Sequence, residues 1–160
     1  MNYTFNWNMI LSSPYRDWII DGFIVTLKIS GISIVAALLL GIIIAVMRLS
    51  KVKPLVWFSA IYTEFFRNTP LLVQILFWYF GSAAILPYEI KSWILNNFDY
   101  EFAAGVVALS IYTSAFFAEE IRSGIGSIPK NQLEASRACG LGFLQSMAYV
   151  ILPQAFRIRS

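Results

Sequence analysis

Histidine is absent from this chain, and cysteine occurs once, at Cys139. Metal sites of the zinc type and disulfide frameworks need several such residues, so neither is expected here. Catalysis by a serine–histidine or cysteine–histidine pair needs an imidazole base, which this chain does not supply. The sequence therefore predicts no metal site, no cofactor and no catalytic residue of these kinds.

Charge is also scarce. Charged residues make up 13% of the chain and hydrophobic residues 58%, and the mean hydropathy is +0.66. A soluble domain carries roughly 25% charged residues, so this composition indicates an integral membrane protein in contact with the lipid bilayer. The net charge of +3 comes from scattered Lys and Arg, which does not indicate a nucleic-acid partner.

Nucleotide-binding patterns are missing as well. The chain has no Gly-rich phosphate loop followed by Lys-Ser or Lys-Thr, so we expect it neither to bind ATP nor to be an enzyme. The opening residues "MNYTFNWNM" carry no basic segment or small-residue cleavage site. We therefore expect no cleavable signal peptide.

Apolar runs predict an all-α membrane protein with three spanning helices. The first span covers about 22–46 and contains one charge, Lys28, whose long side chain can reach the interface. The third covers about 102–121 and ends in Glu119, Glu120 and Arg122. A short surface helix is expected between the second and third spans, within "PYEIKSWILNNFDY".

The second run, 55–86, would measure about 48 Å as one helix, which exceeds a hydrocarbon core of about 30 Å. Pro70 disfavours helical geometry at Thr69, so we divide the run there. Residues 55–67 are expected to form an interfacial helix or an extension outside the core. Pro70 is expected to open the second span, about 70–86, as a first-turn proline.

Lys and Arg counts in short loops predict the orientation. Basic residues follow the first and third spans: Arg48, Lys51, Lys53, Arg67, Arg122, Lys130, Arg137, Arg157 and Arg159. The opposite side holds Arg16 and Lys91. We therefore expect residues 1–21 outside the cytoplasmic membrane and residues 122–160 inside.

Small residues recur at four-residue spacing in the first span, at Ser33, Ala37, Gly41 and Ala45. Such a strip lets a second helix approach closely, although the sequence does not say which helix.

Polar residues within the spans are candidates for a substrate path. Gln74 has two open interpretations, a structural role or the lining of a polar interior. Thr113, with Ser110 and Ser114, can hydrogen-bond to its own helix, so a structural role competes with a functional one. For Glu119 the competing explanation is an ion pair with Arg122 three residues on.

After the third span, residues 129–153 predict a helix, a glycine turn and a second, amphipathic helix at the membrane surface. Pro129 fits a first-turn proline, and Gly140 and Gly142 interrupt the helical pattern. Pro153 is expected to end or kink the second helix. A plain surface hairpin packed beneath the spans is the alternative interpretation.

This segment, "EASRACGLGFLQSMAYVILPQAF", resembles the cytoplasmic EAA loop of ABC importer permeases. That pattern reads E-A-A, three residues, G, nine residues, I, one residue, L-P. Glu134-Ala135-Ser136, Gly140, Val150 and Leu152-Pro153 match it, with Ser for Ala and Val for Ile as departures. The stretches "FFRNTPLLVQILFWYFG" and "AFFAEEIRSGIGSIPKNQLEASRACGL" resemble the polar amino-acid branch of the family.

The resemblance implies a type I transmembrane domain over 22–160. It also implies several partners: cytoplasmic ATPase subunits, a second permease subunit and an extracytoplasmic amino-acid-binding protein in a bacterial inner membrane. The residues implied to contact the ATPase are Glu134, Ala135, Ser136, Gly140 and Leu141. Gln74, Thr113 and Glu119 are expected near the translocation path, with glutamate or aspartate as the expected substrate.

Members of this family usually continue for two further spans after the loop, so we expect the chain to be truncated. Two alternatives remain open at this stage. One is a small helical channel, carrier or scaffold that works without an ATPase, and the other is a non-functional fragment.

Overall fold

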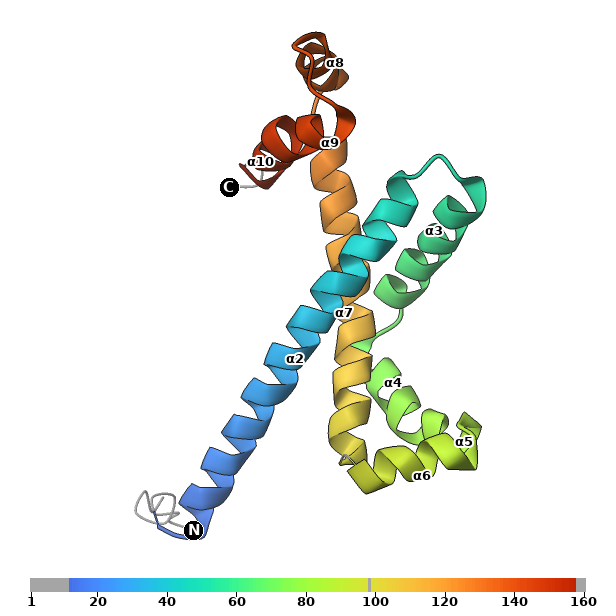
Figure 1. Ribbon diagram of the computed structural model, residues 1–160. Helices are drawn as coiled ribbons and strands as arrows, with labels where there is room; N and C mark the ends of the chain where they lie inside the picture. The colour runs from blue at the N-terminus through green and yellow to red at the C-terminus, as the bar shows by residue number, and fades with distance from the viewer. Residues whose placement is uncertain (1–11, 98, 158–160) are drawn as a thin grey trace, which may run out of the picture.

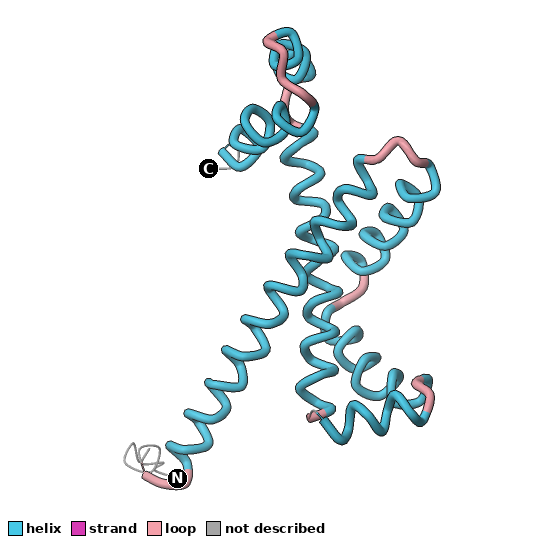
Figure 2. The backbone as a smooth tube through the Cα atoms, in the orientation of Figure 1, coloured by secondary structure: helices cyan, strands magenta, loops and turns pink. Residues whose placement is uncertain are grey.

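The computed structural model describes residues 12–97 and 99–157, and throughout this part the chain is helical without a strand (Figures 1 and 2). The expected all-α class is confirmed. The elements in chain order are α2 (Tyr15–Leu49), α3 (Lys53–Asn68), α4 (Leu71–Leu76), the π-helix η1 (Phe77–Gly81), α5 (Ser82–Ile85), α6 (Tyr88–Asn97), α7 (Tyr100–Gly126), α8 (Lys130–Ala138), α9 (Phe143–Ser146), the π-helix η2 (Met147–Ile151) and α10 (Leu152–Arg157).

The two longest helices, α2 and α7, cross each other at the centre of the molecule (Figure 1). The buried residues of α2 include Ser33, Ala37, Gly41 and Ala45, so the small-residue strip has a partner, and that partner is α7. At Gly41 the helices lie so close that an added Cβ would be 2.7 Å from the Cβ of Phe117. The approach therefore depends on the missing side chain.

The three predicted spans differ in the length of their helices. Among the described helices, α2 with 35 residues and α7 with 27 are long and apolar enough to cross a membrane. The helical stretch Leu71–Ile85 measures only about 22 Å at 1.5 Å per residue. The second predicted span is therefore too short for a core of about 30 Å unless neighbouring residues contribute.

Helix α3 precedes that short stretch in the chain and could lengthen it. It runs antiparallel to α2 and ends beside the middle of α7, where the chain breaks at Thr69–Pro70 before α4 begins (Figure 1). Helix α3 contacts both long helices, and the expectation that 55–67 is interfacial or an extension outside the core stays a prediction. Pro70 also stands one residue before its helix, as the N-cap of α4 rather than in its first turn.

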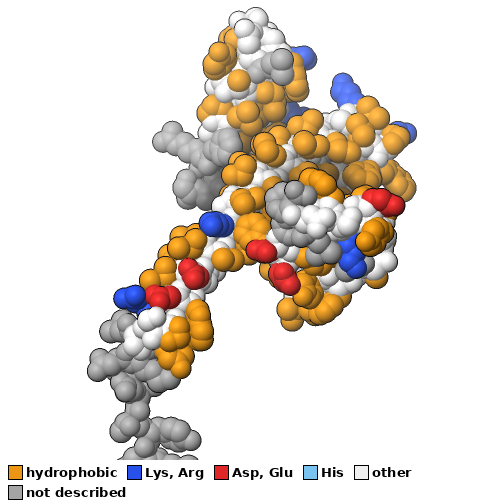
Figure 3. Space-filling model, turned by 60° about the horizontal axis from the view of Figure 1, so that its bottom comes forward, with side chains coloured by type: hydrophobic (Ala, Val, Ile, Leu, Met, Phe, Trp, Pro, Cys, Tyr) orange, Lys and Arg blue, Asp and Glu red, His pale blue; other side chains and the backbone are white. Residues whose placement is uncertain are grey.

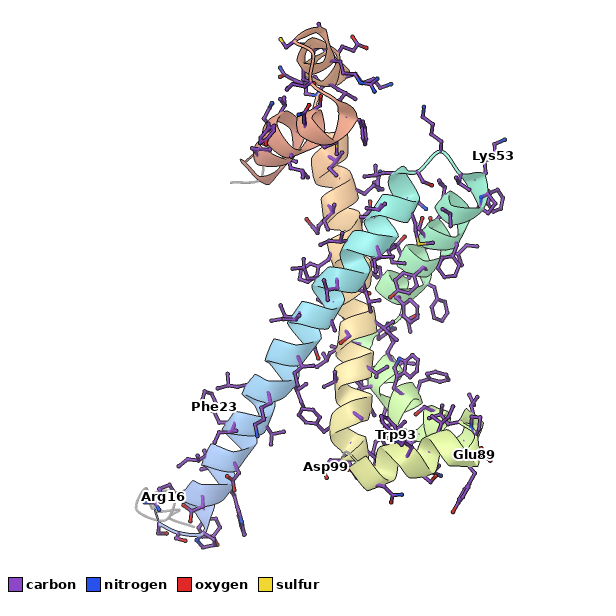
Figure 4. All side chains as sticks on the ribbon, in the orientation of Figure 1. Arg16, Phe23, Lys53, Glu89, Trp93 and Asp99 are labelled. Atoms are coloured by element: carbon purple, nitrogen blue, oxygen red, sulfur yellow. The ribbon has the colours of Figure 1, made fainter. Side chains whose placement is uncertain are left out.

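The first helix begins before the predicted span. Helix α2 starts at Tyr15, so part of the expected N-terminal segment 1–21 is helical; residues 1–11 lie outside the described part. The lower half of α2 diverges from the other helices, and Phe23 there points away from them (Figure 4). Phe23 is 63% exposed, and Trp57 on α3 is 70% exposed.

Apolar side chains cover much of the surface visible in Figure 3. A soluble monomer rarely exposes such broad apolar patches, and contact with lipid accounts for them. Several charged residues lie at the two ends. Lys53 lies at one end, whereas Arg16, Glu89 and Asp99 lie at the other (Figure 4). The expected surface helix is present at that second end as α6.

Candidate functional site

A helical hairpin occupies the end of the molecule beyond α7 (Figure 1). Its first arm is α8, whose N-cap is Pro129, so this proline also precedes its helix by one residue. Its second arm runs from Phe143 to Arg157 through α9, η2 and α10. The predicted helix–glycine–helix arrangement over 129–153 is therefore present, and the hairpin projects away from the α2–α7 crossing.

Gly140 makes the turn between the two arms. Its φ of +85° lies in the left-handed region, which an L side chain rarely adopts. The Gly140 N–H donates to the Arg137 carbonyl at 2.9 Å, and the Leu141 N–H donates to the Ser136 carbonyl at 3.2 Å. This pair of bonds is the Schellman arrangement that closes a helix C-terminus. The sequence pattern places glycine at this position because the turn needs it.

The second arm begins with a different cap. The Gly142 N–H donates to Oε1 of Gln145 at 2.9 Å, which satisfies an end group of the new helix. Pro153 does not end this arm, because α10 continues to Arg157, and the alternative expectation of a kink at Pro153 stays a prediction. The wider π-turns of η2 lie just before Pro153, and such turns often accommodate a local irregularity in a helix.

The residues implied to contact an ATPase divide into two groups. Glu134, Ala135 and Gly140 are exposed, and Leu141 is half-buried. Ser136 is buried, and its hydroxyl donates to the Leu133 carbonyl at 2.8 Å. Ser136 therefore faces the interior of its own hairpin, and its small size suits that position.

Two contacts that join the hairpin to itself and to α7 could not be identified from the sequence. Gln154 on α10 donates to Oε1 of Gln132 on α8 at 3.4 Å. At Gly124 on α7, a Cβ would lie 3.8 Å from the Cβ of Ala155, so α10 rests on α7 at a residue without a side chain. Because these pairs are far apart in sequence, no local pattern predicts them.

Gln74 is buried at the break between α3 and α4. Its amide donates to the carbonyls of Phe66 at 2.9 Å and Thr69 at 3.1 Å, and the Thr69 hydroxyl donates to the Phe65 carbonyl at 2.7 Å. These carbonyls have lost their helical partners, and lipid offers no replacement. The contacts favour the structural interpretation of Gln74, and its place near a substrate path stays a prediction.

Thr113 lies half-buried on α7, next to a hydrogen-bonded contact between helices. The Tyr62 hydroxyl on α3 is 2.7 Å from Oγ of Ser114 and donates to the Ile111 carbonyl at 3.2 Å. Ser110 donates to the Val106 carbonyl of its own helix. Tyr62 is thus a polar residue that the sequence did not single out, and it ties α3 to the third predicted span.

Glu119 forms the ion pair with Arg122 that was considered from the sequence. Nε of Arg122 donates to Oε2 of Glu119 at 2.9 Å. Arg48 and Arg67 also lie close enough to act electrostatically on this carboxylate. The guanidinium carbon of Arg67 lies 5.5 Å from the centre of the Phe116 ring. Glu119 therefore belongs to a group of charges where α2, α3 and α7 meet.

A cavity of about 380 Å³ lies between α2, α7 and α10. Leu38, Phe117, Ile121 and Leu152 line it, together with Glu120. None of the predicted path residues Gln74, Thr113 and Glu119 contributes to its wall.

The helical architecture, the apolar surface and the projecting hairpin define the class of protein as a helical membrane component. Residues 37–158 match the family model described as "Binding-protein-dependent transport system inner membrane component". The chain belongs to this family, and the resemblance seen in the EAA pattern is confirmed.

The relatives within this family that resemble the chain are permease proteins of amino-acid transporters. The chain is 46% identical over 138 residues to a "Probable glutamine ABC transporter permease protein GlnM" of Bacillus subtilis, covering 86% of this chain and 59% of that protein. It is 38% identical to the B. subtilis "Arginine transport system permease protein ArtQ", covering 90% and 62%. It is 39% identical to a "Glutamate/aspartate import permease protein GltK" of Escherichia coli O157:H7, covering 97% and 67%.

A solved structure shares the fold. "Crystal structure of an amino acid ABC transporter with histidines" superposes with a TM-score of 0.77 at 35% identity, covering 97% of this chain and 67% of that one. The chain thus spans about three fifths to two thirds of the length of the relatives it matches.

Proposed function

We propose that this chain forms the membrane part of a permease subunit in an ATP-driven importer of polar amino acids. The observation that carries the proposal is the hairpin 129–153, which joins the EAA pattern to an exposed helix at the basic end of the molecule. The printed names of the relatives support the class of substrate, since they include glutamine, arginine and glutamate/aspartate. They favour no single amino acid.

The energy for transport enters from another chain in this proposal, because no nucleotide motif is present in the sequence. A cytoplasmic ATPase contacts the exposed face of α8 around Glu134 and Ala135. Closure of the ATPases moves the hairpin, and the rigid helices carry this movement to the spans. A second permease subunit and an extracytoplasmic amino-acid-binding protein complete the assembly.

The membrane crossing proposed here has three passes. Helices α2 and α7 provide two, and the broken helix from α3 through α5 provides the other. The break at Thr69–Pro70 supports this arrangement, because non-helical backbone inside a bilayer must be buried in protein and hydrogen-bonded. Gln74 and Thr69 supply those bonds. In this orientation Arg16 lies outside and the hairpin lies in the cytoplasm.

Cys139 provides a direct test, since it is the one cysteine of the chain and lies exposed beside Gly140. A thiol cross-linker should join it to the ATPase in the assembled transporter. A matched variant carries Cys139→Ser together with a cysteine in place of Glu89, at the opposite end, and should not cross-link. An assembled complex that gives no product from Cys139 would contradict the docking assignment.

Two substitutions test coupling in the same assembly. Glu134→Lys reverses the charge of the exposed α8 face, and Gly140→Pro cannot adopt the positive φ of the turn. Both should lower amino-acid uptake per ATP hydrolysed, whereas Glu89→Lys should not. Normal uptake in both hairpin variants would favour a channel or carrier without an ATPase.

A further inference from the structure

Arg67 is a cation that the fold places against the third predicted span. It is the penultimate residue of α3, about 21 Å along the helix from Lys53. Figure 1 shows this end of α3 beside the middle of α7, away from the loop between α2 and α3. A charge at such a position is costly in lipid and usually has a function.

The position of the guanidinium is defined by aromatic packing. It stands over Phe116, with its central carbon 5.5 Å from the ring centre, an arrangement favoured by the cation–π attraction. Phe116 in turn packs on Tyr112, with ring centres 4.9 Å apart. The Tyr112 ring therefore helps to fix the position of the ring that Arg67 contacts. Arg67 is exposed, which leaves its N–H groups accessible to a ligand.

Carboxylates as well as cations lie near Arg67, since Glu64 precedes it by three residues on α3 and Glu119 lies on α7. The nearby carboxylate, Glu119, is held by Arg122 through two hydrogen bonds. Arg48 and Arg67 approach the same carboxylate from α2 and α3. Within the described residues, neither of the two ion pairs includes Arg67. An anionic group arriving here would therefore meet a guanidinium that is not engaged in either of these ion pairs.

We propose that the Arg67 guanidinium, standing over Phe116, binds the α-carboxylate of the transported amino acid. This inference rests on the proposed function. A guanidinium presents two parallel N–H donors that match a carboxylate, and Arg is suited to such pairs in partly dry surroundings. Every amino acid has an α-carboxylate, so this contact holds the shared part of the substrate and leaves its side chain to other residues.

The experiment uses the complete transporter in vesicles and the amino acid that it takes up. Binding to the permease complex is measured without the binding protein, for the amino acid and for its α-carboxamide. The unmodified permease should prefer the acid by about ten- to a hundredfold, since one charged hydrogen-bonded pair is lost with the amide. Arg67→Gln should abolish this preference, and Arg67→Lys should keep part of it.

Lys53→Gln is the matched control, because it removes a cation from the other end of the same helix. Its preference for the acid should equal that of the unmodified permease. An unchanged preference in Arg67→Gln overturns the inference while leaving the proposed function intact. Failure of the unmodified transporter to take up glutamine, arginine, glutamate or aspartate overturns the proposed function instead.

A lipid phosphate has the same oxyanion chemistry, and the choice of vesicle separates the two sources. The binding measurements are repeated in phosphatidylcholine vesicles with and without phosphatidylglycerol. The loss of preference in Arg67→Gln should be equal in both. A defect that occurs only with phosphatidylglycerol assigns Arg67 to the lipid and overturns the carboxylate site.

Discussion

The α2–α7 crossing and the α8–α10 hairpin are stabilised in opposite ways. At the crossing, small side chains allow two helices to meet, and a Cβ added at Gly41 would collide with Phe117. In the hairpin, the shape depends on hydrogen bonds that end one helix and start the next. A lipid-embedded region gains from close packing, because lipid removes the hydrophobic drive between helices. A surface hairpin has water as a competitor, so a positive φ and caps determine its path.

The largest effect is expected at the crossing, for Gly41→Leu. Its Cβ would begin 2.7 Å from the Cβ of Phe117 and 3.1 Å from the Ser114 carbonyl, so α2 and α7 must separate. We expect a loss of about 3 kcal/mol in stability, measured by thermal unfolding in detergent. Gly31→Leu on the same helix meets nothing within 4 Å and is the control. Equal stability of the two variants would contradict the crossing.

A second prediction concerns the break beside the crossing. Gln74→Leu keeps the volume but removes both hydrogen bonds to the Phe66 and Thr69 carbonyls. We expect a destabilisation of about 2 kcal/mol, since buried carbonyls are left unpaired. The same unfolding measurement applies. If Gln74 instead lined only a substrate path, uptake would fall without a change in stability, so the two measurements together decide its role.

A smaller effect is expected in the hairpin, for Gly140→Ala. No atom lies within 4 Å of the new methyl group, so the cost comes from the φ of +85° alone and should be about 1 kcal/mol. Gly142→Ala, where φ is not positive, should cost less. Limited proteolysis near residue 140 measures the local opening. Equal digestion of both variants would argue against the strained turn.

The smallest effect is expected between the two arms. The contact from Gln154 to Gln132 spans 3.4 Å and is only partly buried, so its coupling energy should be about 0.5 kcal/mol. A double-mutant cycle with Gln132→Leu and Gln154→Leu measures it. A coupling as large as the Gln74 effect would show that the hairpin, like the crossing, depends on buried contacts.

Local features of the chain predicted much of this structure. Pro70 marks the helix break, Gly140 marks the turn, and the four-residue spacing around Gly41 marks the contact face of α2. Each of these features affects the conformation of its own backbone or of residues one helical turn away, so it can be recognised from the local sequence. The helix starts at Pro70 and Pro129 were placed one residue too early, because a proline suits both the N-cap and the first turn.

Contacts between distant segments were not predictable in this way. Hydropathy describes α3 as a partly polar helix and does not reveal that Tyr62 reaches Ser114, 52 residues away. The contact of Arg67 with Phe116, 49 residues along the chain, was missed for the same reason. Gln74 was ambiguous in the sequence because its amide can equally bind a substrate or a broken backbone, and its hydrogen bonds to the Phe66 and Thr69 carbonyls become visible only in the folded chain.

The diverging lower half of α2 has a consequence for the order of folding. Around Gly22 and Gly31 nothing else in the described chain lies within 4 Å of where a side chain would begin. Within this half, α7 is reached at Ile29, whose Cδ1 lies 3.9 Å from where a Cβ on Gly105 would be, so the residues around Gly22 depend on lipid for their burial. We expect such a helix to be able to form in lipid before α7 packs against it at Gly41, and its N-terminal half, with Trp18 and Phe23 exposed, stays uncovered by the described chain after the crossing has formed.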